Sequence, residues 1–160
     1  MKKLKQNMQW LMLIIFLMPL INISAAPKKI SVRNRGNLIV KIIGFKNAKG
    51  SARIALYNSE NEYATAGYSE KGALLTAIAP VRNLQASYTF KNLPFGEYGI
   101  KLFHDKDSSS RFRTNIFGIP SQAYGFSNNP PIKGGMPSYQ QIKFIFNANH
   151  RQQTITLKGG

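Results

Sequence analysis

Alternating apolar and polar residues along most of the chain predict β-strands. In residues 37–45, Leu38 and Ile42 belong to an apolar set that alternates with a more mixed set of side chains. A two-residue period rich in β-branched residues is typical of a strand with a buried face. Residues 51–59 repeat the pattern, and a turn ending at Gly50 separates the two segments. We therefore expect 37–45 and 51–59 to form a hairpin.

Five further segments show strand patterns of the same kind: residues 74–81, 86–93, 93–105, 141–147 and 153–158. Residues 60–73 hold three of the six acids, with glycines and tyrosines between them, so we expect a surface connection there. No segment after residue 25 shows helical periodicity. About seven strands at short spacing indicate an all-β fold, a sandwich of two antiparallel sheets packed face to face.

The first residues have the order of a secretory signal peptide. Basic residues at the start are followed by an apolar run over residues 10–23 and then by Ser24, Ala25 and Ala26. The alternative is an uncleaved membrane anchor, which needs about 20 apolar residues. The run is shorter than that and contains Pro19, which favours a cleaved peptide.

The expected organisation is a helical signal peptide at 1–25, a basic linker at 26–36 and one sandwich domain at 37–160. Cleavage is expected after Ala25 or Ala26. The expected location is the periplasm or the exterior of the cell, and no transmembrane segment is expected to remain after cleavage.

Charge and cysteine content narrow the function classes. The chain has no cysteine, which excludes disulfides, thiol catalysis and thiolate metal sites. Removing three signal-peptide lysines from 22 basic residues leaves 19, against six acids, a net charge of +13. Such a surface attracts anionic polymers or lipid headgroups in a salt-dependent way. The alternative is that the charge only maintains solubility.

A short phrase, "FKNLPFGEYGIKLFHD", links two of the expected strands through a proline-glycine turn. It resembles a signature of small β-sandwich modules similar to transthyretin, the carboxypeptidase regulatory domain and collagen-adhesin B repeats. The resemblance implies a transthyretin-like or immunoglobulin-like sandwich in which Tyr98 enters a core strand and Gly96 takes a backbone geometry that a Cβ would hinder. It carries no information about activity.

Residues 104–140 form a long connection without clear strand patterning, and such loops are usually functional or mobile. The loop is rich in glycine, proline and asparagine, yet it also contains large apolar residues, namely Phe112, Ile116, Phe117, Ile119, Tyr124, Phe126 and Tyr139. We therefore expect it to be ordered, folding back onto the domain as an Ω-loop does.

The stretch "HDKDSSSRFRTNIFGIPSQAYGFSNNP" resembles the hallmark of domain-of-unknown-function family twenty-one forty-one, whose members are small exported bacterial proteins. That family's pattern reads approximately "HDxNxNGxLDxNxxGIPxExxGFSNN", and the resemblance extends over essentially the whole mature chain. It implies a β-sandwich in the periplasm or outside the cell, and it brings no activity, substrate or cofactor.

The first half of this stretch has the alternating oxygen donors of a calcium loop, namely Asp105, Asp107, Ser109 and Asn115. Asp107 and Ser109 stand where the family has asparagine and keep an oxygen donor, whereas Ser110 replaces glycine, Arg113 replaces aspartate and Gln122 replaces glutamate. These changes remove negative charge, so calcium binding would be weak. The favoured alternative is a metal-free loop in which Arg113 pairs with Asp105 or Asp107.

Two further interpretations concern chemistry at the ends of the loop. His104 beside Asp105 could pair a base with an orienting acid, although a histidine at a strand end often only hydrogen-bonds to a neighbouring loop. Zinc is disfavoured because His150 is remote. The "YGFSNN" motif either lines a binding groove or forms a structural turn, the second being favoured. Its side chains are Tyr124, Phe126, Ser127, Asn128 and Asn129.

The leading hypothesis is therefore an exported, non-enzymatic β-sandwich that binds an anionic envelope polymer or surface, with no cofactor and no specific nucleic-acid partner. A structural or adaptor module that docks a protein partner is the alternative. A weak calcium-binding domain and a hydrolase centred on His104 and Asp105 are less favoured.

Overall fold

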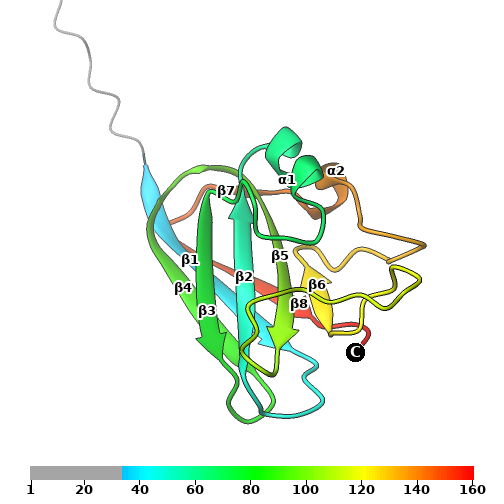
Figure 1. Cartoon of the computed structure of the whole chain (residues 1–160). Coiled ribbons are helices and arrows are strands. Elements are labelled where there is room, and N and C mark those ends of the chain that lie inside the picture. Colours follow the sequence, from blue (N-terminus) through cyan, green and yellow to red (C-terminus); the bar gives the residue numbers. More distant parts are fainter. Residues whose placement is uncertain (1–33) are drawn as a thin grey trace, which may run out of the picture. The chain divides into compact units, whose positions relative to one another are not determined.

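The computed structural model describes residues 34–160, which form two β-sheets and two short helices (Figure 1). The strands are β1 Arg35–Ile43, β2 Ser51–Tyr57, β3 Leu75–Pro80, β4 Ala86–Pro94, β5 Gly96–Asp105, β6 Tyr124–Phe126, β7 Phe144–Phe146 and β8 His150–Thr156. The helices are α1 Glu60–Ala66 and α2 Tyr139–Ile142. The expected signal peptide lies outside the described residues, as does most of the expected linker. Residues 35 and 36, assigned to that linker, are the start of β1.

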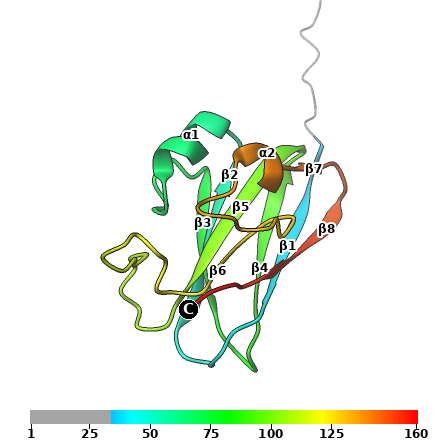
Figure 2. The same cartoon turned by 90° about the vertical axis from the view of Figure 1, so that its right-hand side faces the viewer.

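The two sheets confirm a mostly β fold of the sandwich type (Figures 1 and 2). The smaller sheet has the strand order β4-β1-β8. The larger sheet has the order β3-β2-β5-β6, and β7 pairs with the beginning of β5. The described part of the chain thus has eight strands, one of which, β6, arises inside the expected loop.

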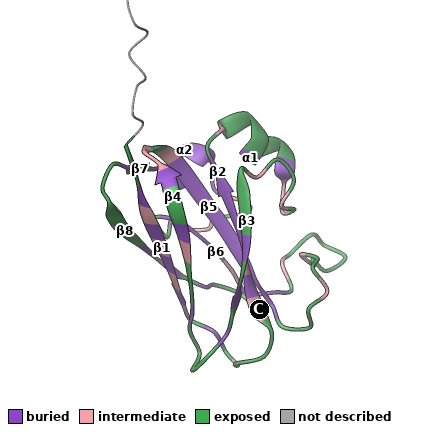
Figure 3. Ribbon diagram, turned by 90° about the vertical axis from the view of Figure 1, so that its left-hand side faces the viewer, coloured by how far each residue is buried: buried purple, intermediate pink, exposed green. Residues whose placement is uncertain are grey.

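The core lies between the sheets and is built from one face of each strand. Leu38, Val40 and Ile42 of β1 are fully buried, and they belong to one cluster with Ile54 and Ile100 of the larger sheet. β5 is buried on both faces from Tyr98 to Asp105, unlike the strands of the smaller sheet (Figure 3). The second face of β5 is therefore covered by something other than a sheet, namely α1, α2 and the long loop.

The expected hairpin of 37–45 and 51–59 is wrong, because β1 and β2 belong to different sheets. β1 pairs with β4 and β8, whereas β2 pairs with β3 and β5. The connection passes through Gly44, whose φ is +87°, and through the buried Phe45, so it crosses from one layer to the other. The alternation of apolar and polar residues predicted which side chains face inward, but it did not predict which strands pair with β1.

The sheets are also not wholly antiparallel, because β1 and β8 run parallel from Asn37↔His150 to Ile43↔Thr156. The two tail strands, β7 and β8, lie in different sheets, and the turn between them again changes layer. Crossings of this kind, rather than hairpins, make most of the connections of this sandwich.

Residues 60–73, expected to be a surface connection, contain a helix, although no helical pattern was expected after residue 25. Ser59 is the N-cap of α1, and its hydroxyl accepts a hydrogen bond from the Glu62 amide at 3.4 Å. Glu60 and Glu62 lie in the first turn, where acids interact favourably with the helix dipole. Tyr63 is buried and anchors the helix on the sheet. Neither helix in residues 34–160 has the length and apolar character that crossing a membrane requires.

The turn between β4 and β5 places Tyr98 as expected and Gly96 in a different way. Tyr98 is buried, and its hydroxyl donates to the Pro94 carbonyl at 2.8 Å. Gly96 does not have a positive φ, so the expected reason for glycine does not hold. A Cβ at Gly96 would lie 3.6 Å from the Tyr98 ring, an ordinary packing distance.

Candidate functional site

Side chains on the outer face of the larger sheet form the chemically richest region of the described residues. Arg53 of β2 alternates with the core residue Ile54, and Lys101 and Phe103 of β5 alternate with the core residue Leu102, so these three side chains point away from the core. Two segments cover them, residues 67–73 after α1 and residues 106–123 between β5 and β6. The candidate site lies between these segments.

Asp105 organises the start of the 106–123 loop. Its carboxylate is buried and accepts hydrogen bonds from the Ser109 amide at 3.0 Å and the Ser110 amide at 2.9 Å. The Ser109 hydroxyl donates a third bond at 3.3 Å. Ser108 and Ser110 have positive φ, so the chain turns sharply around this carboxylate. Asp105 thus holds the loop through the backbone.

Two of the four residues proposed for calcium, Asp105 and Asn115, accept hydrogen bonds from backbone N–H groups. Both Asp105 oxygens accept from backbone amides, and the Asn115 side-chain oxygen accepts from the Phe117 and Ile119 amides at 2.9 and 3.0 Å. Residues 34–160 contain no cluster of three or more acidic or histidine side chains suited to a metal ion. These hydrogen bonds account for the orientation of the Asp105 and Asn115 oxygens without a metal ion.

Arg113 pairs with Asp107 at 2.5 Å on the loop surface. A hydrogen bond with the Ser109 side chain and the Arg113 charge hold the pKa of Asp107 below its usual range. The Arg113 amide donates to the buried side-chain oxygen of Gln122 at 2.8 Å. Gln122 therefore ties the two legs of the loop together.

His104 and Asp105 point to opposite faces of β5, since they are consecutive residues of a strand. A ring nitrogen of His104 lies 2.7 Å from the Lys49 carbonyl, and the ring packs edge-on against Phe45 at 4.9 Å between centroids. The imidazole thus joins the β1–β2 connection to the sheet, and the two side chains do not meet as a base and its orienting acid.

The "YGFSNN" motif forms β6 and the turn after it. Ser127 is fully buried, and its hydroxyl accepts from the Ile100 amide at 2.9 Å and donates to the Ile142 carbonyl. Asn128 donates to the carbonyls of Gln141 and Lys143.

The second asparagine of the motif reaches the smaller sheet. Asn129 donates to Thr154 at 2.9 Å and accepts from the Thr156 amide at 2.8 Å. Both asparagines have positive φ, a conformation that asparagine tolerates better than most residues. The polar groups of Ser127, Asn128 and Asn129 thus satisfy backbone groups, while the Tyr124 ring packs edge-on against Phe112 and Phe126.

An aromatic cleft of about 300 Å³ lies between the two covering segments. One wall is Tyr68, whose ring stacks on Phe112 with 4.7 Å between centroids and 8° between planes. Phe103 meets the same Phe112 edge-on at 5.4 Å. The polar lining consists of Ser69, Glu70, Ser110 and Arg111. The stacked rings of Tyr68 and Phe112 are the contact between the segment after α1 and the loop of residues 106–123 at this cleft.

Lys101 lies below this cleft with its ammonium group buried. The ammonium donates to the Gly67 carbonyl and lies 4.9 Å from the Tyr57 ring centroid and 5.4 Å from that of Tyr63. Burial lowers the pKa of Lys101 to about 8, and the Glu70 charge partly opposes this shift. A desolvated lysine beside a cleft is a frequent mark of a functional site, although structural networks also produce one.

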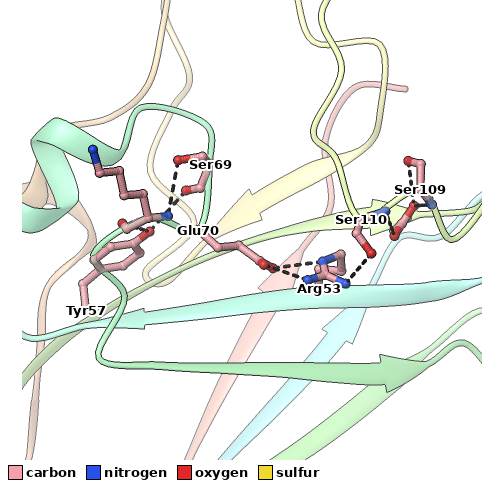
Figure 4. A network of polar contacts seen from close by, with 8 residues as sticks. Arg53, Tyr57, Ser69, Glu70, Ser109 and Ser110 are labelled. Carbon is pink, nitrogen blue, oxygen red and sulfur yellow. Dashed lines mark hydrogen bonds and ion pairs between the residues drawn. The ribbon is translucent and has the colours of Figure 1, made fainter.

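Glu70, which lines the cleft, forms an ion pair with Arg53 (Figure 4). The Arg53 guanidinium donates to both Glu70 oxygens, at 3.1 and 2.8 Å, and to the Ser110 hydroxyl at 3.0 Å. The hydrogen bond to Glu70 raises the pKa of Arg53. Since Ser110 is held by Asp105, this network connects the β2 strand, the segment after α1 and the long loop.

Replacing Lys101 with methionine is expected to flatten the pH dependence of stability below pH 10. The pKa of about 8 in the folded protein lies below the ordinary 10.5. Between these values the unfolded chain keeps the proton that the folded protein releases, so the free energy of unfolding rises with pH. The rise is about 2 kcal/mol between about pH 7 and about pH 9.5. Urea unfolding across this interval measures it, and the methionine variant is expected to lack it.

Lys91→Met, at an exposed site on β4, is the matched control and should keep the rise. The interval ends below pH 10 because burial raises the pKa of Tyr57 and Tyr63 in the fold. Above their ordinary pKa these phenols ionise more readily in the unfolded chain, which lowers stability. A methionine variant whose pH profile parallels the parent protein would contradict the assignment.

The sequence interpretation missed Lys101, Arg53, Glu70 and Tyr68. The signal for Lys101 was present, because β5 carries apolar residues on both faces, as in "YGIKLF". A strand covered on both faces buries any lysine within it. Glu70 and Tyr68 gave no signal, since their place depends on how the segment after α1 folds back.

A second surface is defined by charge. β1, β4 and β8 carry four basic residues, Arg35, Lys41, Lys91 and Arg151, and no acid. All six acids of the chain belong to the larger sheet, to α1 or to the segments over the larger sheet. α1 and α2 also pack on that side, against β2 and β5. We call the outer face of β4-β1-β8 the acid-free face.

A groove of about 480 Å³ crosses one end of the acid-free face. Lys41, Ser87 and Gln152 line it from the three neighbouring strands, and Arg82 and Gln85 line it from the turn before β4. Arg82 and Gln85 exchange two backbone hydrogen bonds, at 2.8 and 2.9 Å. The two residues between them, Asn83 and Leu84, have φ of +49° and +58°. This tight turn fixes the groove wall beside the sheet.

Comparison with known proteins relates the chain to one family. Neither the curated proteins nor the solved structures compared with it gave a match. A family model matches residues 40–155, which includes β2 to β7, the second half of β1 from Val40, all of β8 except Thr156, and the entire 104–129 stretch. The match extends over well more than half of the 160 residues. The chain therefore belongs to the bacterial family described as "uncharacterized protein conserved in bacteria (DUF2141)".

Proposed function

We propose that this protein is a non-enzymatic binding module of the periplasm or cell exterior that holds an anionic polymer against its acid-free face. The observation that carries the proposal is the separation of charge between the two sheets. The groove beside β1 has two cations, Lys41 and Arg82, and its lining includes no acid. Exposed cations without nearby acids raise the local concentration of anions and steer their approach.

The groove also supplies hydrogen-bonding groups of the kind that a repeating polymer needs. Gln85, Ser87 and Gln152 present amide and hydroxyl groups beside the two cations. Cations and neutral donors together suit phosphate or carboxylate groups separated by sugar or alcohol units. An open groove along a sheet also accommodates an extended chain better than a small molecule, which requires an enclosed pocket.

In this proposal the long loop stabilises the domain and does not bind the polymer. The proposal assigns no catalytic role to His104. The imidazole of His104 lies against the Lys49 carbonyl, and Asp105 holds backbone amides on the other face of the strand. These contacts support a structural use of both residues.

The test compares two double variants of equal charge. Lys41→Glu with Arg82→Glu changes the groove, whereas Lys71→Glu with Lys133→Glu changes two exposed lysines outside β4-β1-β8. We expect the first pair to weaken binding of fluorescent polyphosphate or polygalacturonate by about tenfold or more. The second pair is expected to have a much smaller effect. Fluorescence polarisation at several salt concentrations measures both.

Equal losses in the two double variants would show that net charge alone attracts the polymer, which contradicts a site on the acid-free face. Failure of the unmodified chain to bind either polymer at low salt would contradict the proposal as a whole. The two polymers distinguish a preference for phosphate from one for carboxylate.

A further inference from the structure

The tip of the long loop presents large apolar side chains to solvent. Ile116 is 93% exposed, Phe117 79% and Ile119 59%, the three highest values among the large apolar residues in the described part of the chain. The sequence interpretation expected these side chains to pack on the domain. That expectation holds for Phe112 and Tyr124, which pack against each other, and it is wrong for the tip.

The tip is a turn held by hydrogen bonds within residues 114–120. Thr114 and Pro120 form a β-bridge at its base. Within it, the Asn115 amide donates to the Ile119 carbonyl at 2.8 Å, and the Gly118 amide donates to the Asn115 carbonyl at 3.0 Å. The Asn115 side-chain oxygen accepts from the Phe117 and Ile119 amides. Four backbone N–H groups of residues 115–119 thus have partners inside the tip.

Internal partners matter because apolar surroundings offer none. A backbone segment enters the apolar part of a bilayer at low cost only when its N–H groups are already hydrogen-bonded. The Asn115 cap meets this requirement for most of the tip, and it holds the three apolar side chains outward at the same time.

The legs of the loop are cationic. Residues 106–123 contain Lys106, Arg111 and Arg113 and one acid, Asp107. All three cations are exposed, and since Arg113 pairs with Asp107, the net charge of residues 106–123 is +2. The loop extends away from the two sheets, with the tip at its far end (Figure 2). An apolar tip above a cationic base matches the layers of an anionic membrane surface, with acyl chains inside and negative headgroups outside.

We propose that residues 116–119 insert into the interfacial layer of an anionic lipid bilayer, with Lys106, Arg111 and Arg113 at the level of the headgroups. The charge of the loop and its outward position favour a lipid surface over an apolar pocket of a protein partner. This inference concerns a different face from the polymer groove and does not depend on it.

The experiment reads the depth of the tip in vesicles. The full chain has one tryptophan, Trp10, so Trp10→Phe combined with Phe117→Trp leaves a single reporter at the tip. With vesicles of phosphatidylglycerol and phosphatidylcholine, we expect a blue shift of the emission and quenching by brominated acyl chains. With phosphatidylcholine alone, half-maximal quenching at position 117 is expected to require about tenfold more lipid.

The matched control is Trp10→Phe with Ile145→Trp, a site that is 52% exposed on β7. Because residues 10–23 are apolar and could hold the chain on vesicles, binding alone is not the readout. Quenching at position 117 with none at position 145 supports the proposal. Equal quenching at both positions, or none at 117, overturns it. A concentration-dependent blue shift at 117 without vesicles would also overturn it, by showing contact between two copies of the chain.

A second pair of variants separates this inference from the polymer groove. Phe117→Ser with Ile119→Ser is expected to abolish the preference for vesicles that contain phosphatidylglycerol over vesicles of phosphatidylcholine alone. Polyphosphate binding is expected to remain unchanged. Lys41→Glu with Arg82→Glu is expected to do the reverse. If the Phe117→Ser, Ile119→Ser variant weakens vesicle binding and polyphosphate binding equally, the tip has no specific role with lipid.

Discussion

Replacing Asp105 with alanine is expected to lower the free energy of unfolding by about 3 kcal/mol, by the same amount in calcium and in chelator. The variant removes the acceptor of two backbone amides and one hydroxyl around a buried carboxylate. Hydrogen bonds to a charged acceptor are stronger than neutral ones, and the amides left without a partner add their desolvation cost. Urea unfolding at neutral pH measures the change.

The control is Asp107→Ala, two residues along the same loop. Its carboxylate is exposed and pairs with Arg113 on the surface, so we expect little change in stability. The calcium interpretation makes a different prediction. An ion at 100 times its dissociation constant would stabilise the parent protein by about 2.7 kcal/mol, and Asp105→Ala would abolish that gain. A calcium-dependent midpoint would therefore contradict the interpretation of the loop as metal-free.

Replacing Gly50 with alanine is expected to cost about 3 kcal/mol or more, because two penalties combine. Gly50 has a φ of +68°, a conformation that alanine adopts only with strain. A Cβ there would also lie 2.1 Å from the Asp105 carbonyl oxygen and 2.7 Å from the Lys106 Cα. These are backbone atoms at the end of β5, so the connection between β1 and β2 would have to move. The free energy of unfolding measures the loss.

Gly118 provides the matched comparison for the same substitution. Its φ is +75°, and a Cβ there would have no atom within 4 Å. Gly118→Ala is therefore expected to cost only the backbone strain, about 1 kcal/mol. The difference between the two alanine variants isolates the clash at Gly50. Similar losses in both would mean that the connection near Asp105 yields easily, contrary to the packing described.

Sequence patterns were most informative about which face of a strand is buried. The alternation around Leu38 and Ile42 correctly identified the buried side of β1, and Tyr98 was correctly placed in the core. The partner of β1 was not predictable in the same way, because an apolar face packs equally well beside any strand of suitable length. Gly44 and Gly50 are compatible both with a hairpin and with a crossing between layers, so they did not distinguish the two.

The candidate site was less predictable than the fold. The alternation of β5 could have shown that His104 and Asp105 face opposite sides, since both lie in one strand. Hydrophobicity alone could not separate Phe112, which packs on Tyr68, from Phe117, which lies in solvent. The difference arises from the Asn115 turn, whose hydrogen bonds hold the tip outward. The acid-free face could not be predicted from the charges along the sequence, because it depends on β1, β4 and β8 being neighbours in one sheet.

The parallel pairing of β1 with β8 has a consequence for how the chain is made. During synthesis β1 leaves the ribosome first, but one of its two hydrogen-bonded neighbours is the last strand of the fold. The smaller sheet therefore cannot close until residue 156 has emerged, and one edge of β1 stays unpaired until then. Pairings this remote in sequence also slow folding, because a long loop must close before the contact forms. Folding of this domain is accordingly expected to finish only after residue 156 has left the ribosome, and until then the unpaired edge of β1 is open to a chaperone.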